Sequence, residues 1–226
     1  MFVGHYAASL ALKTFEKRAS LGVLFLAVQF VDILFFPFVL LGIERMNVIE
    51  NFTKSTHFEL VSMPYTHGLV GSLLWAAIAY ALFRWFIVKS NSVATVIAAA
   101  VFSHWLLDLL VHTPDLPVWN DSSLKLGFGL WNFPLVTYFL EAALLVLASW
   151  AYMRSTSATS KIGKYGMPAF IVFLLLVNAA NIFGPMLGDS KLNLAIFALT
   201  SYFLFAAVAF WLDTKRTWPG REDPQI

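Results

Sequence analysis

The sequence predicts an all-α protein, a polytopic membrane helical bundle of about six transmembrane helices with an N-terminal half-length re-entrant helix. Three observations predict this fold class. Hydrophobic residues make up 59% of the 226 residues and charged residues only 12%, whereas soluble domains carry about 25% charged residues. Six apolar segments are long enough to cross about 30 Å of hydrocarbon. Basic residues also gather in alternate links between these segments, as the positive-inside rule requires.

The segments form one transmembrane domain over residues 1–212, followed by a polar cytoplasmic tail at 213–226. The predicted spans lie near 20–42, 64–88, 93–112, 131–153, 166–188 and 193–212. With six spans, both termini, the link between spans two and three and the link between spans four and five share one side. That side holds eleven of the 15 lysines and arginines, and the other side holds four. The bias places both termini in the cytoplasm.

Residues 1–15 are apolar but too short to span a membrane alone, and they precede a basic turn at Lys17 and Arg18. We therefore expect a half-length helix that turns back beside the first span. His5 precedes Arg18 by about as many residues as Asp32 follows it. At a rise of 1.5 Å per residue, both side chains lie about 20 Å above the cytoplasmic face.

The third span carries His104, Asp108 and His112, spaced so that all three lie along one face of an α-helix. Ionisable groups within hydrocarbon cost several kcal/mol, so they face the protein interior and mark functional sites. His104 and Asp108 lie one helical turn apart, and an imidazole and a carboxylate at that spacing can bind the same metal ion.

Helix rise places the other ionisable groups near the same depth. His104 lies about 17 Å, Asp108 about 23 Å and His67 about 25 Å above the cytoplasmic face. Five groups from four segments therefore converge, and we expect them to be metal ligands: His5, Asp32, His67, His104 and Asp108. Imidazoles and carboxylates without sulfur suit a divalent metal, Zn²⁺ first and Mn²⁺ or Fe²⁺ as alternatives.

Such a metal lowers the pKa of a bound water and supplies a hydroxide nucleophile near neutral pH. Asp108 or Asp32 is then a candidate catalytic base instead of a ligand. His112 is a further candidate ligand or proton shuttle, or else an interfacial histidine at a helix end. Glu141, in the fourth span, either supports the site and lines a polar path or is a paired structural carboxylate.

Other classes of membrane protein could use the same residues differently. An ion- or proton-coupled transporter or permease would relay charge through the cluster and need a water path across the membrane. A haem protein would need paired histidines at one depth, against which the neighbouring aspartates argue. In a regulatory or scaffold protein the cluster would be a hydrogen-bonded structural network without metal. The absence of cysteine excludes thiolate chemistry, and the net charge of +2 gives no reason to expect nucleic-acid binding.

Four stretches in order resemble a known family. These are residues 4–9 (GHYAAS), 31–33 (VDI), 65–68 (YTHG) and 103–108 (SHWLLD). They are similar to the Gly-His, Pro-Asp-Ile-Asp, Thr-His-Ser and Ser-His-x-x-x-Asp segments of the YdjM-like family of inner-membrane-associated metal-dependent hydrolases, some of which are described as LexA-binding. The resemblance covers about the first 120 residues.

The resemblance implies metal-assisted hydrolysis of an ester, such as a phospholipid phosphoester, in the cell inner membrane. The partners would be membrane lipids and a small-molecule or lipid substrate, and the oligomeric state stays open. The chain departs from the family pattern at residues 33–35 (ILF), where the family has a second Asp and often a His, and at 63–64 (MP), where it has His-Arg. These departures favour a site with one metal ion, or a non-catalytic site, over a site with two metal ions.

Overall fold

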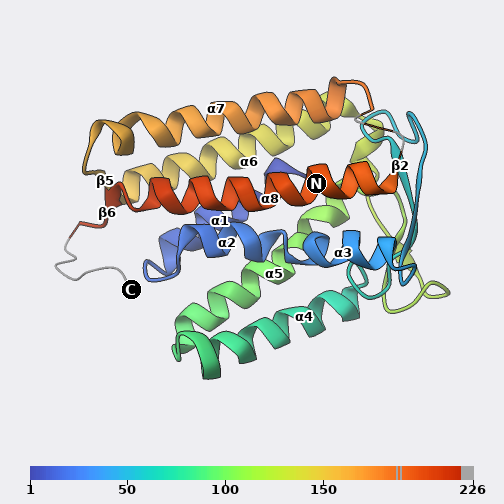
Figure 1. The fold of residues 1–226 in the computed structure, drawn as a ribbon, viewed down its shortest axis with the longest axis horizontal. Helices are drawn as coiled ribbons and strands as arrows, with labels where there is room; N and C mark the ends of the chain where they lie inside the picture. The colour runs from blue at the N-terminus through green and yellow to red at the C-terminus, as the bar shows by residue number, and fades with distance from the viewer. Residues whose placement is uncertain (187, 189, 220–226) are drawn as a thin grey trace.

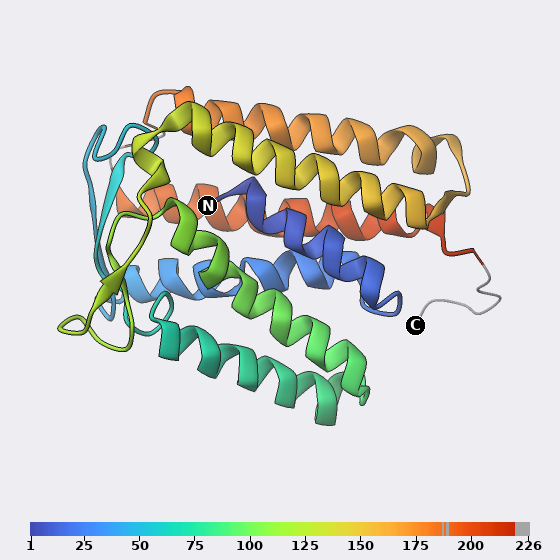
Figure 2. The ribbon, with the colours of Figure 1, turned by 180° about the vertical axis from the view of Figure 1, so that it is seen from behind.

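The chain folds into a bundle of helices that run roughly along one long axis (Figures 1 and 2). The computed structural model describes residues 1–186, 188 and 190–219. The α-helices are α1 (Val3–Phe15), α2 (Leu21–Val28), α3 (Phe30–Leu40), α4 (Leu69–Leu82), α5 (Asn91–Val111), α6 (Pro134–Ser155), α7 (Lys161–Phe183) and α8 (Lys191–Asp213). A π-helical turn, η1 (Phe83–Ile87), extends α4, and a 3-10 turn, η2 (Leu130–Asn132), precedes α6.

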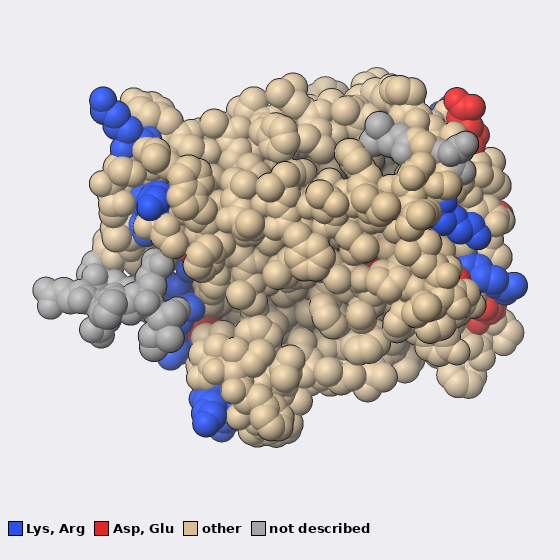
Figure 3. All heavy atoms as spheres, in the orientation of Figure 1, with Lys and Arg blue, Asp and Glu red and all other residues tan. Residues whose placement is uncertain are grey.

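The helices have the length and composition of membrane spans. Within the described part of the chain, five are long and apolar enough to cross a membrane, or six if α2 and α3 form one span. Large apolar side chains such as Leu74, Phe139 and Leu176 are more than half exposed on the outside of the bundle. Figure 3 shows charged residues at the two ends of the bundle and an almost uncharged surface between them. This distribution is that of a membrane protein.

Helix α1 lies inside the bundle, packed against α6, α2 and α5 (Figure 2). Its 13 residues reach only about 20 Å, short of a bilayer's hydrocarbon core. Val3, Tyr6 and Leu10 are fully buried. A short helix surrounded by longer ones brings its N-terminal residues to the middle of the bundle.

The predicted span near residues 20–42 corresponds to two helices that meet at a bend. Helices α2 and α3 meet at Gln29 with a bend of 47°. Pro37 lies inside α3, away from this bend. The break leaves the Val28 carbonyl outside the regular helix ladder, and it accepts a hydrogen bond from His104 instead. It also places Asp32 in the first turn of α3, where the helix dipole favours an anion.

Two other predicted boundaries also differ from the structure. Span two begins at Leu69 because Pro64 and Gly68 hold a turn, so His67 precedes the helix. Helix α7 ends at Phe183, since Gly184 and Pro185 do not continue a helix. Position 187 of the predicted fifth span lies outside the described residues.

The links at one end form antiparallel β-hairpins. Strand β1 (Arg45–Val48) pairs with β2 (Phe58–Ser62), and β3 (Leu116–Pro117) pairs with β4 (Lys125–Leu126). At the opposite end β5 (Ser157–Ala158) pairs with β6 (Arg216–Thr217).

The last pairing holds the start of the predicted polar tail against the bundle. Arg216 and Trp218 are buried there. The Arg216 guanidinium donates to the backbone carbonyls of Met153, Thr156 and Gly163. Residues 220–226 of the predicted tail lie outside the described residues.

Candidate metal centre

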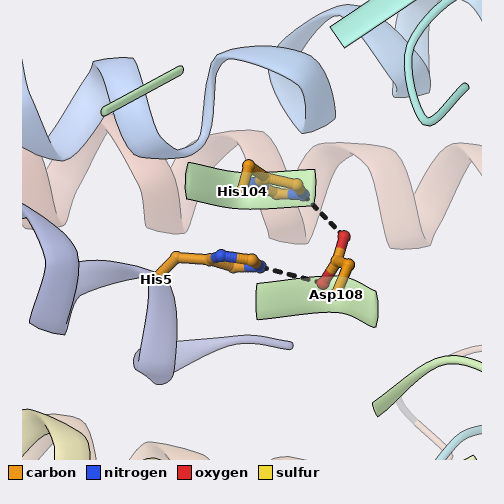
Figure 4. Close-up of side chains that lie close together, drawn as sticks. All are labelled: His5, His104 and Asp108. Carbon is orange, nitrogen blue, oxygen red and sulfur yellow. Dashed lines mark ion pairs between the residues drawn. The ribbon is translucent and has the colours of Figure 1, made fainter. Parts of the chain in front are cut away.

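The five side chains that the sequence singles out meet in the middle of the bundle. Helix α1 supplies His5, the start of α3 supplies Asp32, and the turn before α4 supplies His67. Helix α5 supplies His104 and Asp108, and the Asp108 carboxylate lies beside the stacked His5 and His104 rings with one oxygen toward each (Figure 4). All but Asp32 are almost fully buried, and the Asp32 side chain is 16% exposed.

The distances between these groups are those of neighbouring ligands on one ion. His104 Nε2 lies 3.0 Å from Asp108 Oδ2, and His5 Nε2 lies 3.1 Å from Asp108 Oδ1. His67 Nε2 lies 3.1 Å from Asp32 Oδ1, and His104 Nε2 lies 3.6 Å from the same oxygen. Two ligands bound to one ion at about 2.1 Å lie about 3.0–3.5 Å apart. The spacing therefore suits coordination without rearrangement of the backbone.

Hydrogen bonds on the far side of two histidine rings fix their tautomers. His104 Nδ1 donates to the Val28 carbonyl at 2.6 Å. The Thr66 hydroxyl gives its one proton to Glu44 Oε2, so it accepts the 2.8 Å hydrogen bond from His67 Nδ1. Both Nε2 atoms therefore face the carboxylates with a lone pair, unless the ring is protonated. Metal-binding histidines are held in this way.

A lone pair that faces a carboxylate oxygen is repelled unless a positive charge lies between them. Protonation of every ring does not provide this charge without a cost. The His5 and His104 rings stack at 3.8 Å with an interplanar angle of 7°, and two positively charged rings at that distance repel each other. His5 also makes no hydrogen bond through either ring nitrogen, although both are buried. The terminal ammonium of Met1 contacts Asp108 Oδ1. A divalent cation held there would bind His5 Nε2 and both carboxylates at once.

Two overlapping groups have metal-ligand spacing. His5, His104 and Asp108 form one, and Asp32, His67 and His104 form the other, with all ligand atoms of each group within 4.8 Å of one another. His104 belongs to both, so the two groups adjoin, and each by itself has the spacing of one metal site. Two imidazoles and a carboxylate with an open position form the ligand set of catalytic zinc sites.

The two further sequence candidates surround this centre and contribute differently. His112 Nε2 lies 3.4 Å from Asp108 Oδ2, and its Nδ1 donates to Asp115. Glu141 accepts the backbone N–H groups of Phe2 and Gly4 at 3.0 and 2.9 Å. Glu141 thus anchors the N-terminal end of α1 and positions His5, while His112 lies at the edge of the ligand cluster.

Sequence reasoning missed three supporting residues. The Tyr202 hydroxyl on α8 donates to Asp32 Oδ2 at 2.9 Å. Glu44 and Thr66 form the chain of hydrogen bonds behind His67. Burial raises the pKa of the Glu44 carboxyl, and hydrogen bonds from Thr66 and Tyr65 oppose that shift. Two features of the sequence could have indicated two of these residues: Glu44 follows an apolar segment, and the hydroxyl residue Thr66 is next to His67.

A cavity of about 360 Å³ adjoins the cluster. Its polar end is formed by Asp32, Asp108, His112, Glu141 and Tyr202, and the rest of its wall is mostly apolar. Small-molecule sites have this character, an apolar wall with a few polar groups at one place.

Comparison of the chain with family models, curated proteins and solved structures gives no match. The case for a function therefore depends on the residues themselves.

Replacement of Thr66 by valine is expected to lower the affinity for the metal about 10–100-fold, the usual effect of losing a residue that orients a ligand. The hydroxyl that fixes the His67 tautomer is lost, while the volume of the side chain is kept. Isothermal titration of the metal-free protein with Zn²⁺ measures the change. Thr14→Val is the matched control, because its hydroxyl bonds only the Ala11 carbonyl; equal affinities in the two variants would contradict the role of Thr66.

Proposed function

We propose that this protein is a metal-dependent hydrolase embedded in the membrane, acting on a lipid-like or phosphoester substrate. The observation that carries the proposal is that both carboxylates of the His/Asp cluster, Asp32 and Asp108, line a mostly apolar cavity. A structural network has no need of an adjoining cavity, whereas an enzyme needs room for a substrate beside its metal.

His5, His67, His104 and the carboxylates Asp32 and Asp108 would hold one divalent ion, Zn²⁺ by preference. When bound, the ion supplies Lewis-acid polarisation and lowers the pKa of a water. In hydrolysis of a phosphodiester, the water oxygen bonds to phosphorus as the bond from phosphorus to the alcohol oxygen breaks. One water proton passes to the departing alcohol and the other stays on the new phosphate. Asp32 and Asp108 both line the cavity, so either can carry the first proton.

The proposed topology has six spans, with α2 and α3 as one broken span and α1 re-entrant from the cytoplasmic side. The end of the bundle that holds the α1–α2 turn, η1 and β6 is rich in lysine and arginine (Figure 3), which favours the cytoplasm for that end and for both termini. We also propose that the chain is a distant member of the YdjM-like family of the cell inner membrane. The four motif stretches support this assignment, and three of them supply the clustered histidines.

A proton- or ion-coupled transporter is the alternative. It requires a polar path on both sides of the cluster. The cavity reaches the cluster from the end covered by β1 and β2. Toward the other end, Tyr6, Leu24 and Phe25 are fully buried, and these large side chains favour the hydrolase over the transporter.

Hydrolysis by the purified protein tests the proposal. Vesicles of mixed phospholipids, incubated with protein and Zn²⁺, are expected to release head-group alcohol or phosphate that mass spectrometry detects. The His104→Gln variant and chelated wild-type protein should both lose this release by more than about 100-fold. The Asp121→Asn variant is the control, because Asp121 is exposed and bonds only Ser62 among the contacts found for it. Equal product from wild type and His104→Gln would refute the proposal.

A further inference from the structure

The apolar part of the cavity lies between α7 and α8 and is open at the membrane-facing surface. On α7 it is lined by Val177, Ala180 and Asn181, and on α8 by Phe197 and Ala198. Val177 lies three and four positions before Ala180 and Asn181, and Leu194 and Ser201 flank the α8 pair at the same spacing, so the lining of each helix follows one face. Ala180, Asn181 and Phe197 are also exposed on the outside of the bundle. These residues therefore form a rim where the cavity meets the surrounding hydrocarbon.

The interior of the cavity is shaped for a hydrocarbon chain. Phe35 and Phe36 of α3, Phe58 and Leu60 of β2 and Ile182 of α7 provide apolar wall. A volume of about 360 Å³ is at the lower end of the roughly 300–1,000 Å³ typical of ligand sites, which suits one chain. Most of the lining is apolar, with Ser55, Thr56, His57 and Asn181 as further polar members besides those near the cluster.

The cavity has both apolar and polar lining, as an amphiphile requires. Ser201 and Tyr202 line it from α8, and Tyr202 donates to Asp32. Asp108 and His112 line the same cavity at the end next to the cluster. With a divalent cation bound, this end attracts an anionic head group, and the carboxylates alone would repel one.

We propose that the substrate is a phospholipid that enters sideways from the membrane between α7 and α8, with one acyl chain in this cavity and its phosphate beside the cation. This proposal depends on the proposed function for the chemistry. The seating of the acyl chain is a separate claim, because it requires neither the metal nor turnover.

Photolabelling tests where the acyl chain of the lipid lies. The probe is a lysophospholipid with a diazirine in its single acyl chain, mixed into vesicles that contain the protein and irradiated. Peptide mass spectrometry should find the label on cavity residues such as Phe35, Phe58 and Val177. The Ala198→Phe variant fills the cavity from α8, and Ala180→Phe blocks the rim from α7. Each should lower the cavity label at least about tenfold, because the added ring occupies the space that the acyl chain needs.

Ala207→Phe is the matched control, since Ala207 is exposed on α8 and does not line the cavity. It should keep the cavity label, and the metal content of all three variants should equal that of the wild type. Label found only on outward-facing side chains, or unchanged cavity label in both Ala198→Phe and Ala180→Phe, would overturn the proposal. Cavity label without hydrolysis in the vesicle assay would instead reject the proposed function and leave the chain-binding cavity standing.

Discussion

The Asp108→Asn variant is expected to lose metal binding by more than about 100-fold, a larger loss than follows from removing a residue that only orients a ligand. Asp108 is the carboxylate nearest to His5 and His104 and also faces His67 and His112. The amide keeps the shape of the side chain but removes the charge that balances a divalent cation. Equilibrium dialysis against ⁶⁵Zn²⁺ measures the affinity directly.

Thermal unfolding provides the second readout for this variant. An ion present at about 100 times its dissociation constant stabilises the wild type by about 2.7 kcal/mol, and Asp108→Asn should show almost none of this stabilisation. Asp121→Asn should behave as wild type. If Asp108→Asn retained the Zn²⁺-dependent rise in unfolding temperature, Asp108 would not be a ligand.

The Asp213→Ala variant is expected to lose about 3–5 kcal/mol of folding free energy, the usual cost of removing one partner of a buried ion pair. Lys13 Nζ lies 2.9 Å from Asp213 Oδ2, and these side chains are only 3% and 8% exposed. Asp213 Oδ1 also accepts the Tyr152 hydroxyl at 2.6 Å. Removal of the carboxylate leaves a buried ammonium and a buried hydroxyl without this acceptor. Chemical unfolding in detergent, followed by circular dichroism, measures the loss.

The double variant Lys13→Met with Asp213→Leu separates the pair from the packing around it. Because it leaves no unpaired charge, it should regain most of the stability that Asp213→Ala loses. Glu59→Ala, which removes the exposed acceptor of Asn47, should change stability by less than about 1 kcal/mol. If the double variant were as unstable as Asp213→Ala, the loss of stability would not come from the uncompensated charge of Lys13.

The depth of the clustered residues could be predicted because a bilayer constrains a helical chain in one dimension. Span boundaries follow from apolar length, and the constant rise of an α-helix then assigns a height to His5, Asp32, His67 and His104. The structure brings these groups and Asp108 together. The half-length of α1 could be predicted for the same reason, since too few apolar residues precede the basic turn.

The details that orient the cluster could not be predicted. The residues around the break at Gln29 include neither glycine nor proline, so the sequence has no local sign of a bend. The hydrogen bond from His104 to the Val28 carbonyl is a long-range contact that only the structure reveals. Thr66 meets Glu44 across 22 residues through the register of a hairpin, and Tyr202 meets Asp32 across 170 residues. Such contacts depend on which helices are neighbours and how they are rotated. The apolar length of a segment and the rise of a helix do not determine either.

The metal content of the purified wild-type protein tests the central claim most directly. Inductively coupled plasma mass spectrometry, after supplementation with Zn²⁺, Mn²⁺ or Fe²⁺ and removal of free ions, is expected to find about one divalent ion per chain, as a single catalytic site holds. Protein free of metal after all three treatments would contradict the claim.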